Sequence, residues 1–212
     1  MSTARDSTRE RILTAARALL VERSYHGTGI DEIARAAGVT RQAVYGYHFG
    51  SKAELLTAMV DHVDRVEGVA ALFEPVERAK DAVGALRALV RAVAELWPRI
   101  GDLARVLDGA RHTDPAAEAA WRSRAVVRRR GIGRLMARVK LEGLLAPGWT
   151  QAAATDLALG LLSPQLHAFL VGECGWTRSN YVTRVEAILV GTLVRTGRAA
   201  PAPRRSTRSR GS

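Results

Sequence analysis

The segment that most constrains the fold is residues 38–52, GVTRQAVYGYHFGSK, in which a glycine turn precedes a threonine that can cap a helix. The helix expected from Thr40 to about His48 is short, and its exposed side chains are arginine, glutamine and tyrosine in place of the usual acids and bases. Arginine can pair with guanine edges, glutamine with adenine edges, and tyrosine hydroxyls with phosphate oxygens. The segment therefore predicts a helix that lies in a groove of DNA.

Two further helices are expected before this one. The first covers about residues 7–22, where apolar side chains recur on one stripe at helical spacing. The second begins at Thr28, because Thr28 and Asp31 have the spacing of a capping box, and it ends at Gly38. Three helices with a short glycine-bearing turn between the second and third predict a helix-turn-helix.

The rest of the chain predicts an all-α protein. Apolar residues make up 47% of the 212 residues, and alternating strand patterns are almost absent. Ser51 and Glu54 form a capping box for a fourth helix, and amphipathic helices punctuated by prolines follow. We therefore expect a DNA-binding domain over residues 1–50 and a helical domain over residues 51–197.

The last two helical segments predict contact between subunits. Residues 151–171 are apolar almost all round, and residues 178–195 carry one apolar face. One small domain seldom has enough interior to bury both, so we expect a homodimer formed through about residues 151–195. Residues 198–212 hold five arginines and no acid, and are expected to be a disordered basic tail.

The net charge of +11 favours a polyanionic partner, but it is unevenly distributed. Residues 1–60 hold eight basic groups against six acids, and the excess lies in the tail and in residues 122–140. The basic residues of this stretch are Arg122, Arg124, Arg128, Arg129, Arg130, Arg134, Arg138 and Lys140. Three interpretations stay open: a solvated helix face, a site for an anionic effector, or ion pairs with acids such as Glu95 and Asp102.

Several classes of protein are excluded by missing signals. The single cysteine, Cys174, excludes an internal disulfide and a multi-cysteine metal site, and we expect it to be packed. No secretory signal, membrane span, nucleophile elbow, phosphate loop, paired-histidine zinc helix or dinucleotide fingerprint occurs. We therefore expect a cytoplasmic protein that is not an enzyme and holds no metal or cofactor.

With the helix-turn-helix placed, the chain resembles TetR-family transcriptional regulators over about residues 8–60. The residues that carry the resemblance are the apolar stripe of the first helix, Tyr25, Thr28, Ile33, Ala34, Ala37, Gly38, Val39, Thr40, Tyr45, His48, Phe49, Ser51, Lys52, Leu55 and Leu56. The resemblance implies a dimeric protein that binds operator DNA and is released, through its fourth helix, by a small-molecule effector in the larger domain.

By position, the resemblance assigns base reading to Arg41 and Gln42. It assigns phosphate contacts to Thr28, Thr40, Tyr45, His48 and Lys52. The family usually has tyrosine, one residue, then His-Phe, whereas this chain has Tyr45-Gly46-Tyr47-His48-Phe49, which is one residue longer. Either Tyr47 is inserted or it takes the role of Tyr45, so both are candidate contacts. A second departure is Ser24, which stands where a glycine is common.

Effector contacts are expected among the aromatic residues of the larger domain. Most of these residues belong to a core, but the tryptophans concentrate there, and ligand sites are mostly apolar. Our candidates for the effector site are Trp97, Trp121 and His167. The alternative function is a non-specific architectural DNA-binding protein that uses the arginine stretch and tail and has no effector.

Overall fold

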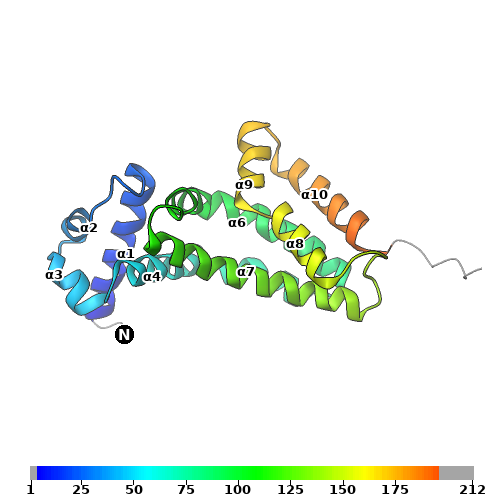
Figure 1. Cartoon of the computed structure of the whole chain (residues 1–212), viewed down its shortest axis with the longest axis horizontal. Helices are drawn as coiled ribbons and strands as arrows, with labels where there is room; N and C mark the ends of the chain where they lie inside the picture. Colours follow the sequence, from blue (N-terminus) through cyan, green and yellow to red (C-terminus); the bar gives the residue numbers. More distant parts are fainter. Residues whose placement is uncertain (1–3, 196–212) are drawn as a thin grey trace, which may run out of the picture.

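The computed structural model describes residues 4–195, and this part is helical without a strand. Its elements are α1 (Ala4–Arg23), α2 (Ile30–Ala36), α3 (Arg41–Ala43), the π-helical turn η1 (Val44–His48), α4 (Lys52–Val66), α5 (Val69–Glu77), α6 (Ala82–Ala110), α7 (Pro115–Leu141), α8 (Gln151–Leu161), α9 (Pro164–His167), the π-helical turn η2 (Ala168–Glu173) and α10 (Arg178–Leu193). Figure 1 shows an elongated molecule with α1–α3 at one end. The expected disordered tail, residues 198–212, lies outside the described residues.

The N-terminal helices form because their apolar residues share one side. Ile12, Leu13 and Ala16 of α1 are fully buried, as the helical stripe predicts. The start of α2 differs from the sequence expectation. Its N-cap is Gly29, whose N–H donates to the Glu32 carboxylate at 3.0 Å, which is the half of a capping box that needs no side chain at the cap. The box predicted at Thr28 is therefore wrong by one residue.

The turn before α2 contains the chain's unusual serine. Ser24 has a φ of 66°, in the left-handed region that favours glycine. The turn therefore keeps a glycine-like backbone at a residue with a side chain. The Ser24 carbonyl accepts the Thr28 hydroxyl at 2.9 Å, which ties the turn to the entrance of α2.

The extra residue near Tyr47 is accommodated by a wide turn of helix. Thr40 caps α3 by accepting the Ala43 N–H at 3.1 Å, as expected. From Val44 onward the helix is π-helical, and the Phe49 N–H donates to the Val44 carbonyl at 2.8 Å, five residues back. A π turn holds one residue more than an α turn at the same length of helix. Val44 and Phe49 both remain buried, so the insertion leaves the core anchors in place.

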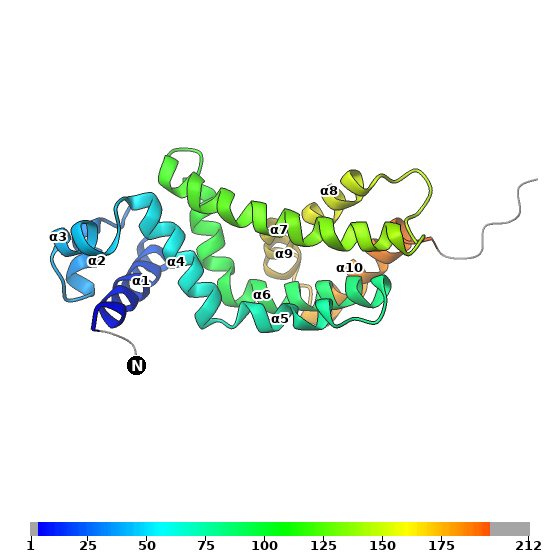
Figure 2. The same ribbon diagram turned by 90° about the horizontal axis from the view of Figure 1, so that it is seen from below.

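Two long helices connect two hydrophobic cores. The C-terminal half of α6 and the start of α7 pack with α1, α2 and α4 in one core, while their other ends pack with α8 and α10 in a second. Residues on both sides of the predicted boundary at residue 50 share the first core, because Leu55, Leu56 and Met59 of α4 are buried in it. Pro98 lies inside α6 without ending it, and Figure 2 shows that α6 changes direction midway.

The C-terminal helices lie on one side of α6 and α7 (Figure 1). Pro164 interrupts the apolar segment as expected, because it begins α9 with Ser163 as the cap. The end of α10 is held to the α7–α8 connection by a single antiparallel bridge between Leu145 and Val194. Cys174 is exposed after η2, so the expectation of a packed thiol is wrong.

Candidate DNA interface and ligand cavity

The helix formed by α3 and η1 has an exposed polar side and a buried apolar side. Arg41 and Gln42 are exposed, and Tyr47 is 66% exposed although it is a large aromatic residue. On the opposite side Val44 and Phe49 are almost completely buried. The arrangement fixes the direction of the exposed side chains through a packed core and leaves them open to a partner.

Arg41 is positioned by an acid of the preceding helix. Its Nη1 donates to Asp31 Oδ2 at 2.8 Å, and both side chains are 61% exposed. An exposed pair of this kind contributes at most about 1 kcal/mol. The pair therefore orients the Arg41 guanidinium, and so weak a pair is easily replaced by a bond to another acceptor.

The remaining predicted contacts differ in how accessible they are. Thr40 is exposed, and because its hydroxyl oxygen only accepts from Ala43, its proton is available to a partner. Tyr45 and His48 are half-buried beside the exposed Tyr47. Thr28 is buried, with its hydroxyl 2.9 Å from the Ser24 carbonyl and 3.1 Å from the Leu19 carbonyl. Its hydroxyl proton is thus used within the fold.

Lys52 lies where the N-terminal domain meets the α6–α7 turn. Its Nζ is 2.9 Å from Asp114 Oδ2 and 4.3 Å from the centre of the Tyr25 ring. Burial acts to lower the pKa of Lys52, but hydrogen bonding to Asp114 and Tyr25 outweighs it, so the pKa is raised. Lys52 therefore keeps its charge and connects the two domains.

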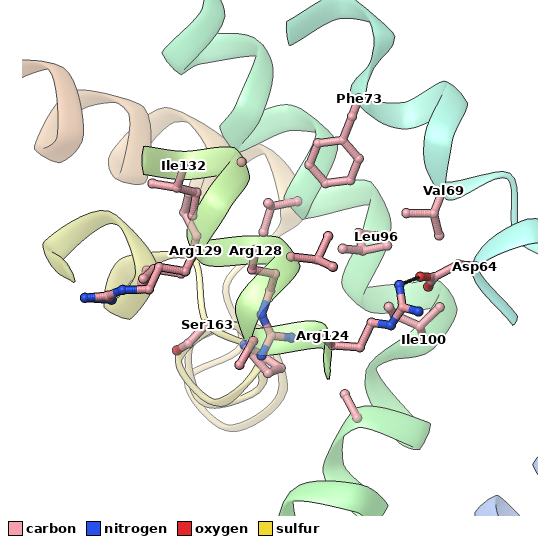
Figure 3. Close-up of a pocket in the computed structure, with 18 of the residues that line it drawn as sticks. Asp64, Val69, Phe73, Leu96, Ile100, Arg124, Arg128, Arg129, Ile132 and Ser163 are labelled. Carbon is pink, nitrogen blue, oxygen red and sulfur yellow. Dashed lines mark hydrogen bonds and ion pairs between the residues drawn. The ribbon is translucent and has the colours of Figure 1, made fainter. Parts of the chain in front are cut away.

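A cavity of about 820 Å³ lies between the two cores. It is lined by α4, α5, α6 and α7 and by the end of α8 with the start of α9. Figure 3 shows apolar side chains such as Val69, Phe73, Leu96 and Ile132 on its walls. Cavities of several hundred Å³ with mostly apolar walls are typical of small-molecule sites. Because Val60, Val63 and Asp64 belong to α4, the cavity borders the helix that carries the N-terminal domain.

Two of the three predicted effector residues line this cavity. Trp97 is buried and donates its Nε1–H to the Leu162 carbonyl at 3.2 Å, and Trp121 lies on the facing helix α7. His167 does not line the cavity. It is buried against Tyr181, with ring centres 4.9 Å apart in an edge-to-face arrangement, and burial lowers its pKa. The structure thus places His167 in the second core.

Charged residues of α7 enter the same cavity, as Figure 3 shows. Arg124 pairs with Asp61 and, at 2.6 Å, with Asp64, both on α4. Arg128 lies between two indoles, 5.9 Å from the Trp97 ring centre and 5.1 Å from that of Trp121.

Several arginines of residues 122–140 form ion pairs, which was one of the three interpretations of this basic stretch. Ion pairs join Arg122 to Glu118, Arg129 to Asp156 and Arg138 to Glu142. The suggested acids have other partners, because Glu95 pairs with Arg178 and Asp102 with Arg105. Arginine spacing on α7 could have identified Arg124 and Arg128, which share one helix face, but Asp64 had no signal in the sequence.

Within residues 4–195 no group of three or more histidine, cysteine or acidic side chains is placed to hold a metal ion. Over the same residues no helix is both long and apolar enough to cross a membrane.

Known proteins resemble part of this chain in sequence. Residues 12–59 match the family described as bacterial regulatory proteins, tetR family. The transcriptional activator FasR of Mycolicibacterium smegmatis is 40% identical over 89 residues, which are 42% of this chain and 39% of FasR. The regulator TtgR of Pseudomonas putida is 36% identical over 86 residues, 41% of this chain and 40% of TtgR. The chain thus spans about two fifths of the length of these relatives.

Solved structures resemble it over nearly the whole length. NalD, the secondary repressor of the MexAB-OprM multidrug efflux pump in Pseudomonas aeruginosa, is 25% identical with a TM-score of 0.71, over 91% of this chain and 98% of NalD. The regulator FadR of Bacillus subtilis, solved with stearoyl-CoA, shares the fold at 17% identity and a TM-score of 0.68, over 85% and 96% of the two chains. The sequence match and these folds agree: residues 12–59 are a DNA-binding segment of the tetR family of bacterial regulatory proteins, and the described chain has the fold of such regulators.

Proposed function

We propose that the chain is a dimeric transcriptional repressor that binds double-stranded operator DNA and is released by a small molecule. The observation that carries the proposal is the α3–η1 surface, where Arg41, Gln42 and Tyr47 are exposed on a helix held by buried anchors. Such a helix can read base edges in the major groove while its neighbours contact the backbone. A regulator of this kind works in the cytoplasm, where the chromosome is.

In this proposal Arg41 and Gln42 read bases. Thr40, Tyr45, Tyr47 and His48 contact phosphates, and Lys52 does so after exchanging Asp114 for a phosphate oxygen. Thr28 supports the turn before α2 and makes no contact through its hydroxyl, because that proton is used within the fold. Residues 1–60 are nearly balanced in charge, so non-specific attraction to DNA is weak. The affinity for DNA then depends on these specific contacts and on simultaneous binding by the two DNA-binding domains of the dimer.

The dimer would form through α8 and α10, within residues 151–195. Ile188 of α10 is 46% exposed, and the small residues Ala187 and Gly191 beside it are exposed too. Ala153 and Gly160 give α8 a similar exposed surface. Two subunits joined here would present two reading helices to half-sites about 34–36 Å apart, or a multiple of that spacing. Sedimentation equilibrium of the wild type and of Ile188→Glu tests this interface.

The effector would act through α4. A ligand in the cavity touches Val60, Val63 or Asp64, and α4 carries the N-terminal domain. Reversing the ratio of the DNA-incompetent to the DNA-competent state from 1:99 to 99:1 requires about a 10⁴-fold preference for the incompetent state. The names of NalD, a repressor, and FasR, an activator, support a regulatory role with either sign of output; repression is the output proposed here.

The decisive experiment compares a selected duplex with random duplexes. The protein is used to select sequences from a random library, and affinities for the selected and a scrambled duplex are then measured across a salt titration. Specific binding should exceed random binding by at least about 10³-fold. Equal affinities at every salt concentration would instead favour the non-specific architectural protein.

The assignment of base readers has its own test. Arg41→Ala should reduce the preference for the selected duplex by about 1–3 kcal/mol per lost bidentate contact. Arg130→Ala, which removes one exposed charge far from the reading helix, is the matched control and should leave the preference unchanged. An unchanged preference in Arg41→Ala would assign base reading to other residues.

A further inference from the structure

We propose that the cavity binds an apolar molecule carrying one anionic group, and that Arg128 is the receptor for that group. The inference rests on the proposed function and narrows its unknown effector to a chemical class. It is carried by the position of Arg128, whose half-buried guanidinium lies in a mostly apolar cavity and forms no ion pair within the described part of the chain.

The arginines around the cavity differ in their exposure and in whether they form ion pairs. Arg129 and Arg138 have acidic partners, Asp156 and Glu142, and so are neutralised locally. Arg134 is exposed at the edge of the cavity. Arg128 alone combines partial burial with the absence, within residues 4–195, of an ion pair.

Arg128 is held in an environment that is unfavourable for an isolated cation. Burial lowers its pKa and the neighbouring positive charge of Arg124 lowers it further, and the more distant charges of Asp108 and Asp64 offset only part of this. The rings of Trp97 and Trp121 provide cation–π contacts, but these compensate only part of the lost hydration. An anionic oxygen group would supply the missing hydrogen-bond acceptors, and its apolar remainder would fill the space along Phe73, Leu96 and Ile132.

Arg124 extends the inference to α4. It lies four residues before Arg128, hence on the same face of α7, and its present partners are Asp61 and Asp64 (Figure 3). An anion bound at Arg128 competes with these acids for Arg124. Withdrawal of Arg124 would remove the ion pairs that join α7 to α4, which is the connection an effector must change.

The test uses two dyes with the same rings and different charge. 1-Anilinonaphthalene-8-sulfonate carries one anionic sulfonate, and N-phenyl-1-naphthylamine is its neutral analogue. Both are titrated into the full-length protein, and dye fluorescence gives the dissociation constants. We expect the anionic dye to bind at least tenfold more tightly than the neutral one.

Substitution of the receptor should abolish the difference. Arg128→Met keeps an unbranched apolar side chain and removes the charge, so the anionic dye should lose at least tenfold in affinity while the neutral dye is unaffected. Arg130→Met removes the same charge from an exposed position outside the cavity and should preserve the ratio. The neutral dye also reports that the cavity remains intact in each variant.

Each other outcome overturns a definite part of the proposal. Equal affinities of the two dyes in the wild type, or a ratio that survives Arg128→Met, would overturn the anionic class while the effector cavity stands. Binding of neither dye would overturn the cavity as an effector site, and with it this inference, but would leave DNA binding untouched.

The role of Arg124 is tested by releasing it. Asp64→Asn removes an acid that competes with the ligand, so the anionic dye should bind at least threefold more tightly and the neutral dye equally well. An unchanged affinity for the anionic dye would remove Arg124 from the proposal and leave Arg128 as the receptor.

Discussion

A single segment, residues 40–52, carries the surface proposed for DNA, whereas the cavity is lined by residues scattered between Val60 and Gln165. The first surface belongs to one short helix and its two ends, whose spacing follows from the local chain. The second exists only after α4–α9 have packed. The surface proposed for DNA is supported by tightly packed side chains, whereas the side chains that line the cavity border open space. The same substitution should therefore have different effects in the two regions.

The largest expected difference is in the removal of an aromatic ring. Phe49→Ala should lower the free energy of unfolding by about 3–5 kcal/mol, because the ring is 2% exposed in a filled core. Phe73→Ala should cost only about 1 kcal/mol, because this ring already borders open space. Urea denaturation of both variants measures the two costs. Equal costs would mean that the cavity wall is as tightly packed as the core.

Two glycine-to-alanine substitutions test whether Gly46 lowers the stability of the protein but favours DNA binding. Gly46 is exposed, and an added Cβ would lie 3.9 Å from the nearest atom, Gln42 Cγ. Gly46→Ala should therefore stabilise the protein by about 0.4–1 kcal/mol. It should also weaken binding to all duplexes several-fold, if the glycine permits close approach of the backbone to DNA.

The control for this substitution is Gly109→Ala in α6, where an added Cβ meets nothing within 4 Å. It should stabilise the protein by a similar amount and leave DNA binding unchanged. Thermal unfolding and duplex titration of the two variants make the comparison. If Gly46→Ala binds every duplex as the wild type does, the glycine has no role in backbone approach.

The contact between Lys52 and Asp114 tests how independent the two regions are. Asp114→Asn keeps the cap of α7 but weakens the ion pair, so stability should fall by about 0.2–1 kcal/mol. Binding to all duplexes should become tighter alike, since Lys52 is then available to phosphate. Asp81→Asn is the matched control, because Asp81 caps α6 and is not the partner of Lys52. Weaker DNA binding in Asp114→Asn would instead mean that the pair positions the N-terminal domain.

The smallest effects are expected from two buried histidines outside both regions, His62 of α4 and His167 of α9. Burial lowers the pKa of both His62 and His167 below the ordinary 6.5, and the positive charge of Arg65 adds to the effect at His62. A lowered pKa means that the unfolded state binds the proton more tightly, so each histidine's contribution is present above pH 6.5 and is lost as the pH falls below it.

Urea denaturation at pH 7 and pH 5 should therefore show a smaller loss of stability on acidification in His62→Gln and in His167→Gln. Added salt should weaken the pH dependence due to His62, which faces Arg65, Arg17, Arg9 and Glu10, more than that due to His167, where burial is the cause. An identical salt response would show that the charges around His62 do not matter.

The reading helix was predictable because its signals are local. The cap at Thr40, the anchors Val44 and Phe49, and the exposed Arg41 and Gln42 follow from spacing along one helix. The start of α2 was misplaced by one residue because the cap is Gly29, which has no side chain and bonds to Glu32 only through its N–H. The π turn could not be derived, since an extra residue can be absorbed in more than one way.

The cavity was only partly predictable. Trp97 and Trp121 were chosen for being aromatic in the larger domain, and they line it because α6 and α7 face each other. His167 has the same kind of composition signal but packs against Tyr181. The partner of Arg124 lies 60 residues away, and no spacing rule reveals a contact at that separation.

The wide turn at residues 44–48 has a consequence for how such a gene can change. Each residue of a helix advances the direction of its side chain by about 100°. Gain or loss of one codon between Val44 and Phe49 would therefore re-aim the intervening side chains, and a change between π and α geometry would let both anchors stay buried. Under the proposed function, such a mutational step would change the preferred DNA sequence and leave the domain folded.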